Sequence, residues 1–155
     1  MRRFLMKHFV TASYLAGVAS CLLVAVPGTG LTSAKAGEAE TIAELQKDGQ
    51  KIFARCRSCH RVGPTARNLV GPSLNGIVDN TAGSSEGFRY SPAMIAKVEA
   101  EGLVWSEENL DAFLRKPKEF LPKTRMQFAG LRSEEDRAAI IAYLKSFDAE
   151  GNQTE

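Results

Sequence analysis

Apolar residues recur at three- and four-residue spacings in several segments beyond residue 40, which is the pattern of amphipathic helices. Ser or Thr precedes each segment as a potential cap, and Gly or Pro follows two of them. No segment alternates with the two-residue period of a strand. The pattern therefore predicts an all-α domain with helices at about 42–55, from Ser91 to Gly102, from Ser106 to Lys116, and after Ser133, where Ile140, Ile141, Leu144 and Phe147 share one face.

The first of these helices would begin at a capping box, residues 41–44, and would carry a glycine within its apolar face. A glycine costs a helix interior about 1 kcal/mol relative to alanine. We therefore expect another element to pass too close to Gly49 for a side chain to fit there. The predicted face consists of Ile42, Leu45, Gly49, Ile52 and Phe53.

A long stretch without helical periodicity follows, from Arg61 to Tyr90, and it is rich in glycine and proline. About thirty residues without secondary structure are unusual inside a compact domain unless something else holds them. A buried cofactor would supply that support, so this stretch points toward a domain that folds around a bound group.

The first 36 residues have the layout of a secretory signal. They contain four basic residues and no acidic one, and an apolar run at 9–26 follows the basic start. The sequence Ala-Lys-Ala at 34–36 supplies a cleavage pattern, so we expect a signal peptide at 1–36 and a mature domain at 37–155. Two alternatives stay open: the run is retained as a membrane anchor, or the chain is lipidated at Cys21.

Removal of the signal changes the charge of the domain. The chain has 20 basic and 18 acidic residues, and subtracting the four basic residues of 1–36 leaves 16 against 18, a net charge of −2. Such a balance gives no reason to expect nucleic acid as a partner. One of the three cysteines lies in the signal, so the mature domain keeps a single pair.

That pair and the next residue, Cys56, Cys59 and His60, have the spacing C-x-x-C-H, the attachment pattern of c-type haem (heme c). Two thiols in this spacing form thioethers with the haem vinyl groups, and the adjacent imidazole becomes the proximal ligand of the iron. A structural zinc site needs four ligands, and the mature chain has only these three cysteine or histidine side chains. A redox-active C-x-x-C belongs in a βαβ context, which the helical pattern does not provide.

Because His60 is the only histidine after the signal, a second histidine ligand is excluded, and the sixth ligand of the iron is Met, Lys or solvent. Met94 falls within a predicted helix and is expected to fill the core. Met126 falls in the irregular segment 122–128, where a loop could carry it to the far face of the haem. Ligation by His and Met would raise the potential and close the iron to other ligands, which suits electron transfer.

From Asp48 to Phe147 the chain resembles class I cytochrome c, the family of mitochondrial cytochrome c and its periplasmic bacterial relatives. The resemblance implies the cytochrome c fold, with four to five helices and long loops around one covalent haem, and with crossing N- and C-terminal helices. It rests on spaced blocks: Gly49 with Phe53, Cys56 to His60, Gly71 to Leu74, Gly87 to Ser91, Trp105, Pro122 to Gly130, and Asp136 through Leu144.

The resemblance also implies roles for single residues. The carbonyl of Pro72 would accept a hydrogen bond from the ring of His60, and Met126 would be the axial ligand on the opposite side of the iron. The other positions that match haem contacts are Tyr90, Trp105 and Thr124 at a buried propionate, and Phe128 beside the exposed haem edge.

Basic residues gather in two stretches that flank the attachment motif and Met126, at 55–67 and 112–132, where Glu119 is the only acid. A slightly acidic domain would then have a positive end at the haem edge, and its field would steer acidic partners there. Ten of the 16 basic residues of the mature chain lie in these stretches: Arg55, Arg57, Arg61, Arg67, Arg115, Lys116, Lys118, Lys123, Arg125 and Arg132.

Together these features predict a monomeric periplasmic one-electron carrier, and not an enzyme. By resemblance, its partners would be a cytochrome bc1 complex, a terminal oxidase, a reaction centre or a periplasmic dehydrogenase, in respiratory or photosynthetic electron transport. A membrane-anchored cytochrome c subunit of such an assembly stays open, and it requires the run at 9–26 to be retained. A small haem peroxidase needs an open iron and an acid–base residue above it, and the lack of a second histidine argues against that activity.

Overall fold

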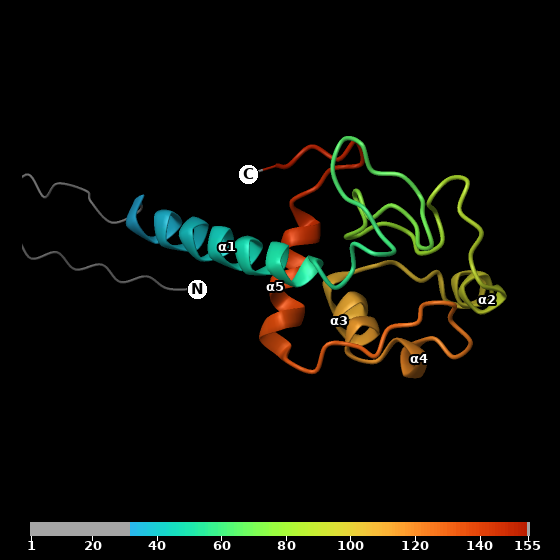
Figure 1. Cartoon of the computed structure of the whole chain (residues 1–155). Coiled ribbons are helices and arrows are strands. Elements are labelled where there is room, and N and C mark those ends of the chain that lie inside the picture. The colour runs from blue at the N-terminus through green and yellow to red at the C-terminus, as the bar shows by residue number, and fades with distance from the viewer. Residues whose placement is uncertain (1–31, 155) are drawn as a thin grey trace, which may run out of the picture.

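Five helices joined by long irregular segments make up the computed structural model, which describes residues 32–154 (Figure 1). In the described residues the only β-type pairs are two isolated bridges, Thr81 with Val104 and Phe147 with Gln153. The prediction of an all-α fold with four to five helices is confirmed. The helices are α1 (Thr32–Phe53), α2 (Pro92–Glu101), α3 (Glu107–Arg115), α4 (Pro117–Phe120) and α5 (Glu134–Lys145).

Three of the helices begin at the serine caps that the sequence predicts. The hydroxyls of Ser91, Ser106 and Ser133 each accept a hydrogen bond from the backbone N–H three residues further on, at 3.0 to 3.3 Å. Pro92 occupies the first position of α2, where a missing N–H leaves no helical bond unmade. Gly102 ends α2 in the left-handed conformation, with φ 62°.

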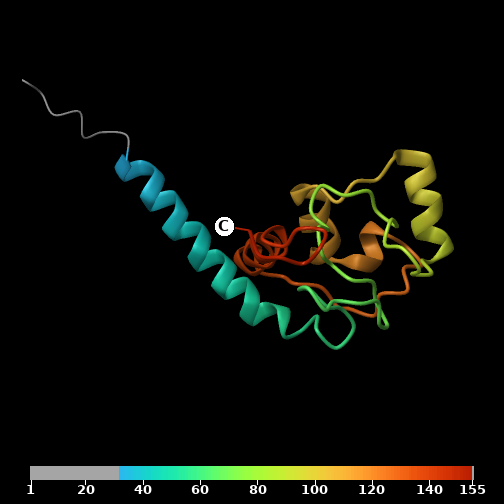
Figure 2. The ribbon, with the colours of Figure 1, turned by 90° about the horizontal axis from the view of Figure 1, so that it is seen from above.

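Helix α1 begins upstream of the predicted start. It covers Thr32–Phe53, so the predicted capping box at 41–44 is wrong and Thr41 lies inside the helix. Ala, Lys and Glu, which are strong helix formers, make up most of the sequence between 34 and 40 and carry the helix through this stretch. The N-terminal half of α1 extends away from the other helices (Figure 2). Ile42, at the start of the predicted apolar face, is accordingly 51% exposed.

The predicted close approach at Gly49 is the crossing point of α1 and α5 (Figure 1). A Cβ atom on Gly49 would overlap the carbonyl oxygen of Ala139 and would lie 2.5 Å from the Cβ of Tyr143. No side chain fits between the two helices there. Next to the crossing, the rings of Phe53 and Tyr143 pack with their centroids 5.6 Å apart. The expected crossing of the first and last helices is therefore confirmed.

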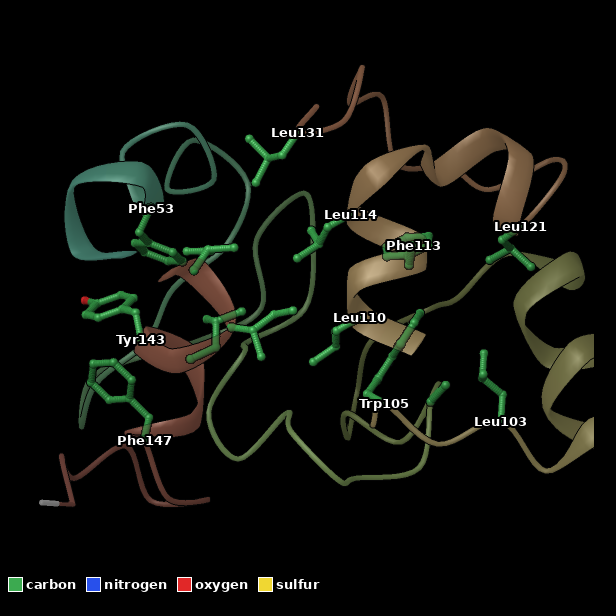
Figure 3. Packing of buried hydrophobic residues seen from close by; sticks show 14 of the residues in the cluster. Phe53, Leu103, Trp105, Leu110, Phe113, Leu114, Leu121, Leu131, Tyr143 and Phe147 are labelled. Atoms are coloured by element: carbon green, nitrogen blue, oxygen red, sulfur yellow. The ribbon is translucent and has the colours of Figure 1, made fainter. Parts of the chain in front are cut away.

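The core extends from this crossing to the region under α2, with α3 in the middle (Figure 3). Phe53 and Tyr143 lie at one end of it, and Leu121, which is 2% exposed, lies at the other. Between them the ring of Trp105 packs on Phe113, with 4.9 Å between the centroids. This chain of buried side chains is the platform from which the two loops that carry the site project.

The first of these loops is the predicted irregular stretch between α1 and α2, and the structure confirms that it contains no helix. The side chain of Asn75 joins two parts of this loop. It accepts a hydrogen bond from the N–H of Gly63 at 2.9 Å and donates one to the carbonyl of Gly63 at 3.0 Å. The N–H of Gly76 donates to the carbonyl of Phe147 at 3.2 Å. The loop is thus tied to itself and to the end of α5.

Candidate haem-binding site

The attachment motif lies in the turns that directly follow α1. The N–H groups of Cys59 and His60 both donate to the carbonyl of Cys56, each at 3.0 Å, so the motif forms one tight turn. Cys56 and Cys59 are free, half-buried thiols. Burial raises the pKa of Cys56 above its ordinary value, against the opposing charge of Arg55. A redox-active cysteine has a lowered pKa, so this environment does not favour dithiol chemistry.

The ring of His60 has a fixed orientation and protonation. Its Nδ1 lies 2.8 Å from the carbonyl oxygen of Pro72. A carbonyl can only accept a hydrogen bond, so Nδ1 must carry the proton. Burial lowers the pKa of His60 below its ordinary value, against the opposing effect of this hydrogen bond, and so favours the neutral form of the ring. The lone pair is therefore on Nε2, where a metal ion can be bound.

Gly71 packs directly against the His60 ring, a role that the sequence analysis missed. A Cβ atom at this position would lie 2.7 Å from both ring nitrogens. The N–H of Gly71 also donates to the carbonyl of Cys59 at 2.9 Å. The backbone at 71–72 thus confines the ring from one side and also accepts the hydrogen bond from its Nδ1. The Gly-Pro pair was visible in the sequence, but its distance to the histidine was not.

The second loop, which joins α4 to α5, brings Met126 to the segment that carries Tyr90. The guanidinium of Arg125 donates to the carbonyls of residues 89 and 90, at 3.2 and 3.3 Å. The N–H of Met126 donates to Oγ1 of Thr124 at 3.2 Å. Met126 is partly buried and packs against the edge of the core, whereas Met94 is 7% exposed within the core. The prediction of Met94 as a core residue is confirmed.

The three side chains expected at a haem propionate each have a proton to donate. The hydroxyl of Tyr90 accepts from the N–H of Ser85 at 3.2 Å, and that of Thr124 accepts from the N–H of Met126. A hydroxyl that accepts one bond still has its own proton free to donate. The indole N–H of Trp105 donates to no described residue, although the side chain is 5% exposed. An anionic group is the partner that such a set of donors fits.

Apolar side chains around the two loops are packed against the core on one side and partly exposed on the other. A flat apolar group between the loops would remove their exposed surface from water, and this burial is favourable. Two free thiols could attach a haem through thioethers, and a neutral imidazole beside them could bind its iron, with a methionine available on a separate loop. The residues present therefore fit a haem. The side chains concerned include Val62, Leu74, Ile77, Val78, Tyr90, Met126 and Phe128.

Comparison with known proteins decides the family. The family model for cytochrome c matches residues 46–148. The chain belongs to the cytochrome c family. It is 45% identical over 108 residues to cytochrome c2 of Afifella marina, an alignment that covers 70% of this chain and 86% of that protein. It is also 45% identical over 105 residues to cytochrome c2 of Rhodoblastus acidophilus, covering 68% of this chain and 94% of that protein.

A solved structure shows the same fold. The structure of cytochrome c2 from Rhodospirillum Centenum matches with a TM-score of 0.62 and 42% sequence identity, covering 66% of this chain and 98% of that one. The predicted class I cytochrome c of the bacterial periplasmic type is therefore confirmed, and with it the covalently bound haem c. The function is electron transfer and not enzymatic catalysis. Among the described helices, none is both long and apolar enough to cross a membrane.

Proposed function

We propose that the chain is a periplasmic one-electron carrier whose iron is held by His60 on one side and by Met126 on the other. The observation that carries this proposal is the fixed, neutral ring of His60 beside two free thiols. Haem c supplies the ferrous–ferric couple when it is bound. The alternative of a membrane-anchored subunit shares this site and differs in the fate of residues 1–36.

The protein residues would tune and protect that couple. The carbonyl of Pro72 holds the proton on Nδ1 of His60, which fixes the ring and makes Nε2 more basic. The thioether of Met126 would fill the last coordination position and exclude water and substrates from the iron. Proton donors from Tyr90 and Trp105, together with Thr124, would offset the charge of a buried propionate. The site then changes its charge by one electron without binding a substrate.

We also propose that residues 1–36 are a signal peptide, that residues 37–155 are the mature domain, and that export places it in the periplasm. The apolar run at 9–26 lies outside the described residues. The family match starts at residue 46, and Ala36 lies in the part of α1 that extends away from the other helices. Cleavage after Ala36 would therefore remove no part of the matched domain.

The intact mass of the purified, exported protein should equal residues 37–155 plus one covalent haem. A signal is cut after small residues such as those at 34–36. Mass spectrometry checks processing and attachment in the same measurement. The mass of the whole chain plus haem would instead support the anchored subunit, and a chain that starts at Cys21 with attached lipid would support lipidation.

The partners are redox proteins, and we propose that they dock at the basic surface around the haem edge. All ten basic residues of the two stretches are exposed. Arg55 lies over the ring of Phe128, 5.8 Å from its centroid, which joins the end of α1 to the Met126 loop. A groove beside Phe128 has Lys116 and Lys118 among its lining residues. A cytochrome bc1 complex, a terminal oxidase, a reaction centre or a dehydrogenase with an acidic docking face would suit this surface.

Two of these residues allow a direct test of docking. Lys118 and Lys123 are exposed and make no ion pair with a described residue. Arg125 is less suitable, because it donates hydrogen bonds to backbone carbonyls and its change to Glu would also disturb the loop. Lys145 would be a poor control because it pairs with Glu107 at 2.5 Å. Lys47 is the better control, since it is exposed and unpaired among the described residues and lies on α1, across the molecule from α4.

Oxidation of the reduced protein by an acidic redox partner, or by the anion hexacyanoferrate(III), should slow steeply as salt rises. The reason is that the Debye length falls from about 10 Å at 0.1 M to about 3 Å at 1 M. Changing Lys118 or Lys123 to Glu should slow association several-fold at low salt with little change in potential, because such charges act on the on-rate. Stopped-flow absorbance measures both effects. Equal slowing by Lys47→Glu would show that net charge, and not the haem edge, governs the encounter.

A further inference from the structure

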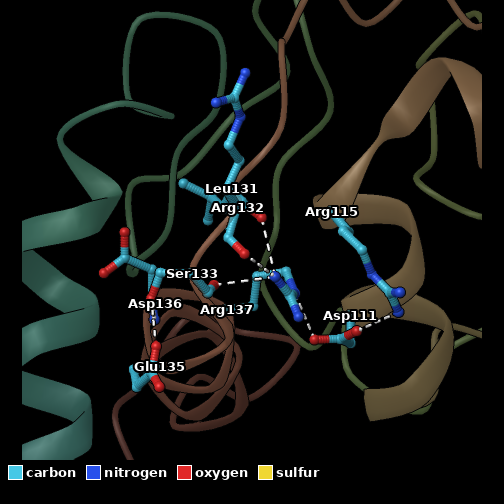
Figure 4. A network of polar contacts seen from close by, with 8 residues as sticks. All are labelled: Asp111, Arg115, Leu131, Arg132, Ser133, Glu135, Asp136 and Arg137. Carbon is cyan, nitrogen blue, oxygen red and sulfur yellow. Dashed lines mark hydrogen bonds and ion pairs between the residues drawn. The ribbon is translucent and has the colours of Figure 1, made fainter.

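Arg137 is the only buried charged residue in the part of the chain that the structure describes. Its side chain is 6% exposed, and its guanidinium joins α5 to α3 (Figure 4). Nε donates to Oδ1 of Asp111 at 2.6 Å. Nη1 donates to three consecutive carbonyls, those of Leu131 at 3.1 Å, Arg132 at 2.9 Å and Ser133 at 3.1 Å. The other oxygen of Asp111 accepts from Arg115 at 3.1 Å.

A buried ion pair is a costly way to stabilise a fold. Removing two charges from water costs several kcal/mol per ion, and well-packed apolar residues often do as well. The planar guanidinium of arginine has a different benefit: its several donors lie in one fixed geometry, so it fixes the positions of the groups that it binds. In this protein the fixed partners are backbone carbonyls at 131–133, so the network defines the path of the chain at that point.

Those carbonyls lie at the C-terminal root of the distal loop, which we define as residues 121–131. At this root Leu131 is 2% exposed and its N–H donates to the carbonyl of Leu114 at 2.8 Å. Gly130, with φ 97°, packs so closely on the carbonyl of Arg115 that a Cβ atom would overlap it. At the other root Leu121 is also 2% exposed, and its N–H donates to the carbonyl of Pro117 at 2.9 Å.

Between the two roots Arg125 holds the distal loop to the carbonyls of residues 89 and 90, and the part of the loop after Met126 has little support of its own. The backbone of residues 127–130 makes no hydrogen bond with any described residue. Met126 directly precedes this unsupported stretch, and its only hydrogen bond is the one from its own N–H to Thr124. The place of Met126 is therefore set by Arg125 on its N-terminal side and by the C-terminal root of the loop on the other side, and Arg137 fixes that root.

We propose that Arg137, held by Asp111, is a positioning residue that keeps Met126 in place as the sixth ligand. The proposal rests on the His/Met ligation proposed above. A loop segment without backbone hydrogen bonds opens locally when its root loosens, without unfolding of the domain. The apparent affinity of an external ligand for the iron rises in proportion to the open fraction. Loss of the Arg137 network should therefore expose the iron while the fold persists.

Arg137→Met tests the proposal, because methionine keeps an unbranched chain about as long as the aliphatic part of arginine and removes every donor. In this variant the carboxylate of Asp111, which is 29% exposed, stays in contact with water and retains its ion pair with Arg115. The matched control is Gly49→Ala, which destabilises the α1–α5 crossing and touches no part of the distal loop. Denaturant unfolding of the haem-loaded proteins sets conditions of equal stability for the two variants.

At equal stability, Arg137→Met should raise the affinity of the ferric protein for imidazole by about tenfold, in proportion to the open fraction, while Gly49→Ala should stay near the native value. Hydrogen exchange should be faster at the amides of 127–132 in Arg137→Met than in the control. Asp111→Asn, which leaves a weaker acceptor for Nε, should shift both readouts in the same direction by less. If Arg137→Met does not fold, Asp111→Asn is compared with Gly49→Ala in its place.

The proposal is overturned if neither variant binds imidazole more tightly than Gly49→Ala at equal stability. A failure of the underlying ligation has a different signature. The native ferric protein would then lack the weak red-edge charge-transfer band of a Met–iron bond, or Met126→Ala would retain it. A native band that Met126→Ala abolishes, together with unchanged imidazole binding in both network variants, would leave the ligation standing and remove the role of Arg137.

Discussion

Changing Cys56 and Cys59 together to Ala should convert a haem that survives extraction into one that acid and organic solvent remove. Thioether bonds are covalent and do not dissociate as axial ligands do, so only the native protein keeps haem through denaturation. The variant should also lose much of its fold. The long loop from Arg61 to Tyr90 has no helix, and its apolar side chains gain their second contact surface from the bound group.

The measurements are haem absorbance after acid–solvent extraction and far-ultraviolet circular dichroism of the same samples. Cys21→Ala is the matched control, because this third cysteine lies in the predicted signal and outside the motif. It should retain haem at the native level. Clean extraction of haem from the native protein, or equal loss from the Cys21 variant, would contradict attachment through Cys56 and Cys59.

Local signals in the sequence predicted the helix ends well. A serine cap needs only its own hydroxyl and a backbone N–H three residues later, so Ser91, Ser106 and Ser133 could be recognised without knowledge of the fold. The start of α1 was wrong because the capping box at 41–44 competes with upstream residues that also favour helix. Where two local preferences compete, the sequence alone does not decide between them.

Gly49 shows how a local cost predicts a distant contact. A glycine within an apolar helical face is unfavourable for the helix, so it indicates that another element packs closely against that position. In the structure that element is α5. Gly71 and Arg137 offered no such signal. Gly71 lies in a loop where glycine is ordinary, and Arg137 lies in the first turns of a helix where arginine is ordinary. Their roles come from atoms that the fold brings to them, the His60 ring and the carbonyls of 131–133.

The sequence neighbours of Met94 and Met126 predicted different roles for the two methionines. Met94 falls on a helix with serine and proline at its start, and such a residue is packed into the core, as the structure shows. Met126 falls between breakers in a segment without periodicity, and the structure places it on the distal loop at the edge of the core. A partly exposed side chain on such a loop is available to a bound group, whereas a side chain packed within the core is not.

Changing Met126 to Ala should open the iron. The methyl side chain of alanine cannot coordinate, so the reduced protein should bind carbon monoxide and the ferric protein should gain peroxidase activity. The midpoint potential should fall, on the order of 0.1 V or more, because axial ligands set haem potentials over a range of about 0.8 V. The red-edge charge-transfer band of the ferric protein should disappear. Absorption spectroscopy and a redox titration of the purified protein measure all of these changes.

Met94→Leu is the matched control, since leucine is close to methionine in volume and a buried position tolerates such an exchange. Its potential, its band and its lack of carbon monoxide binding should match those of the native protein. Loss of the band in Met94→Leu with retention in Met126→Ala would reverse the assignment of the sixth ligand. Absence of the band from the native protein would exclude both mature methionines, and a lysine or solvent would then be the sixth ligand. The structure favours Met126 because its loop is the one that Arg125 holds against Tyr90, whereas Met94 is packed within the core under α2.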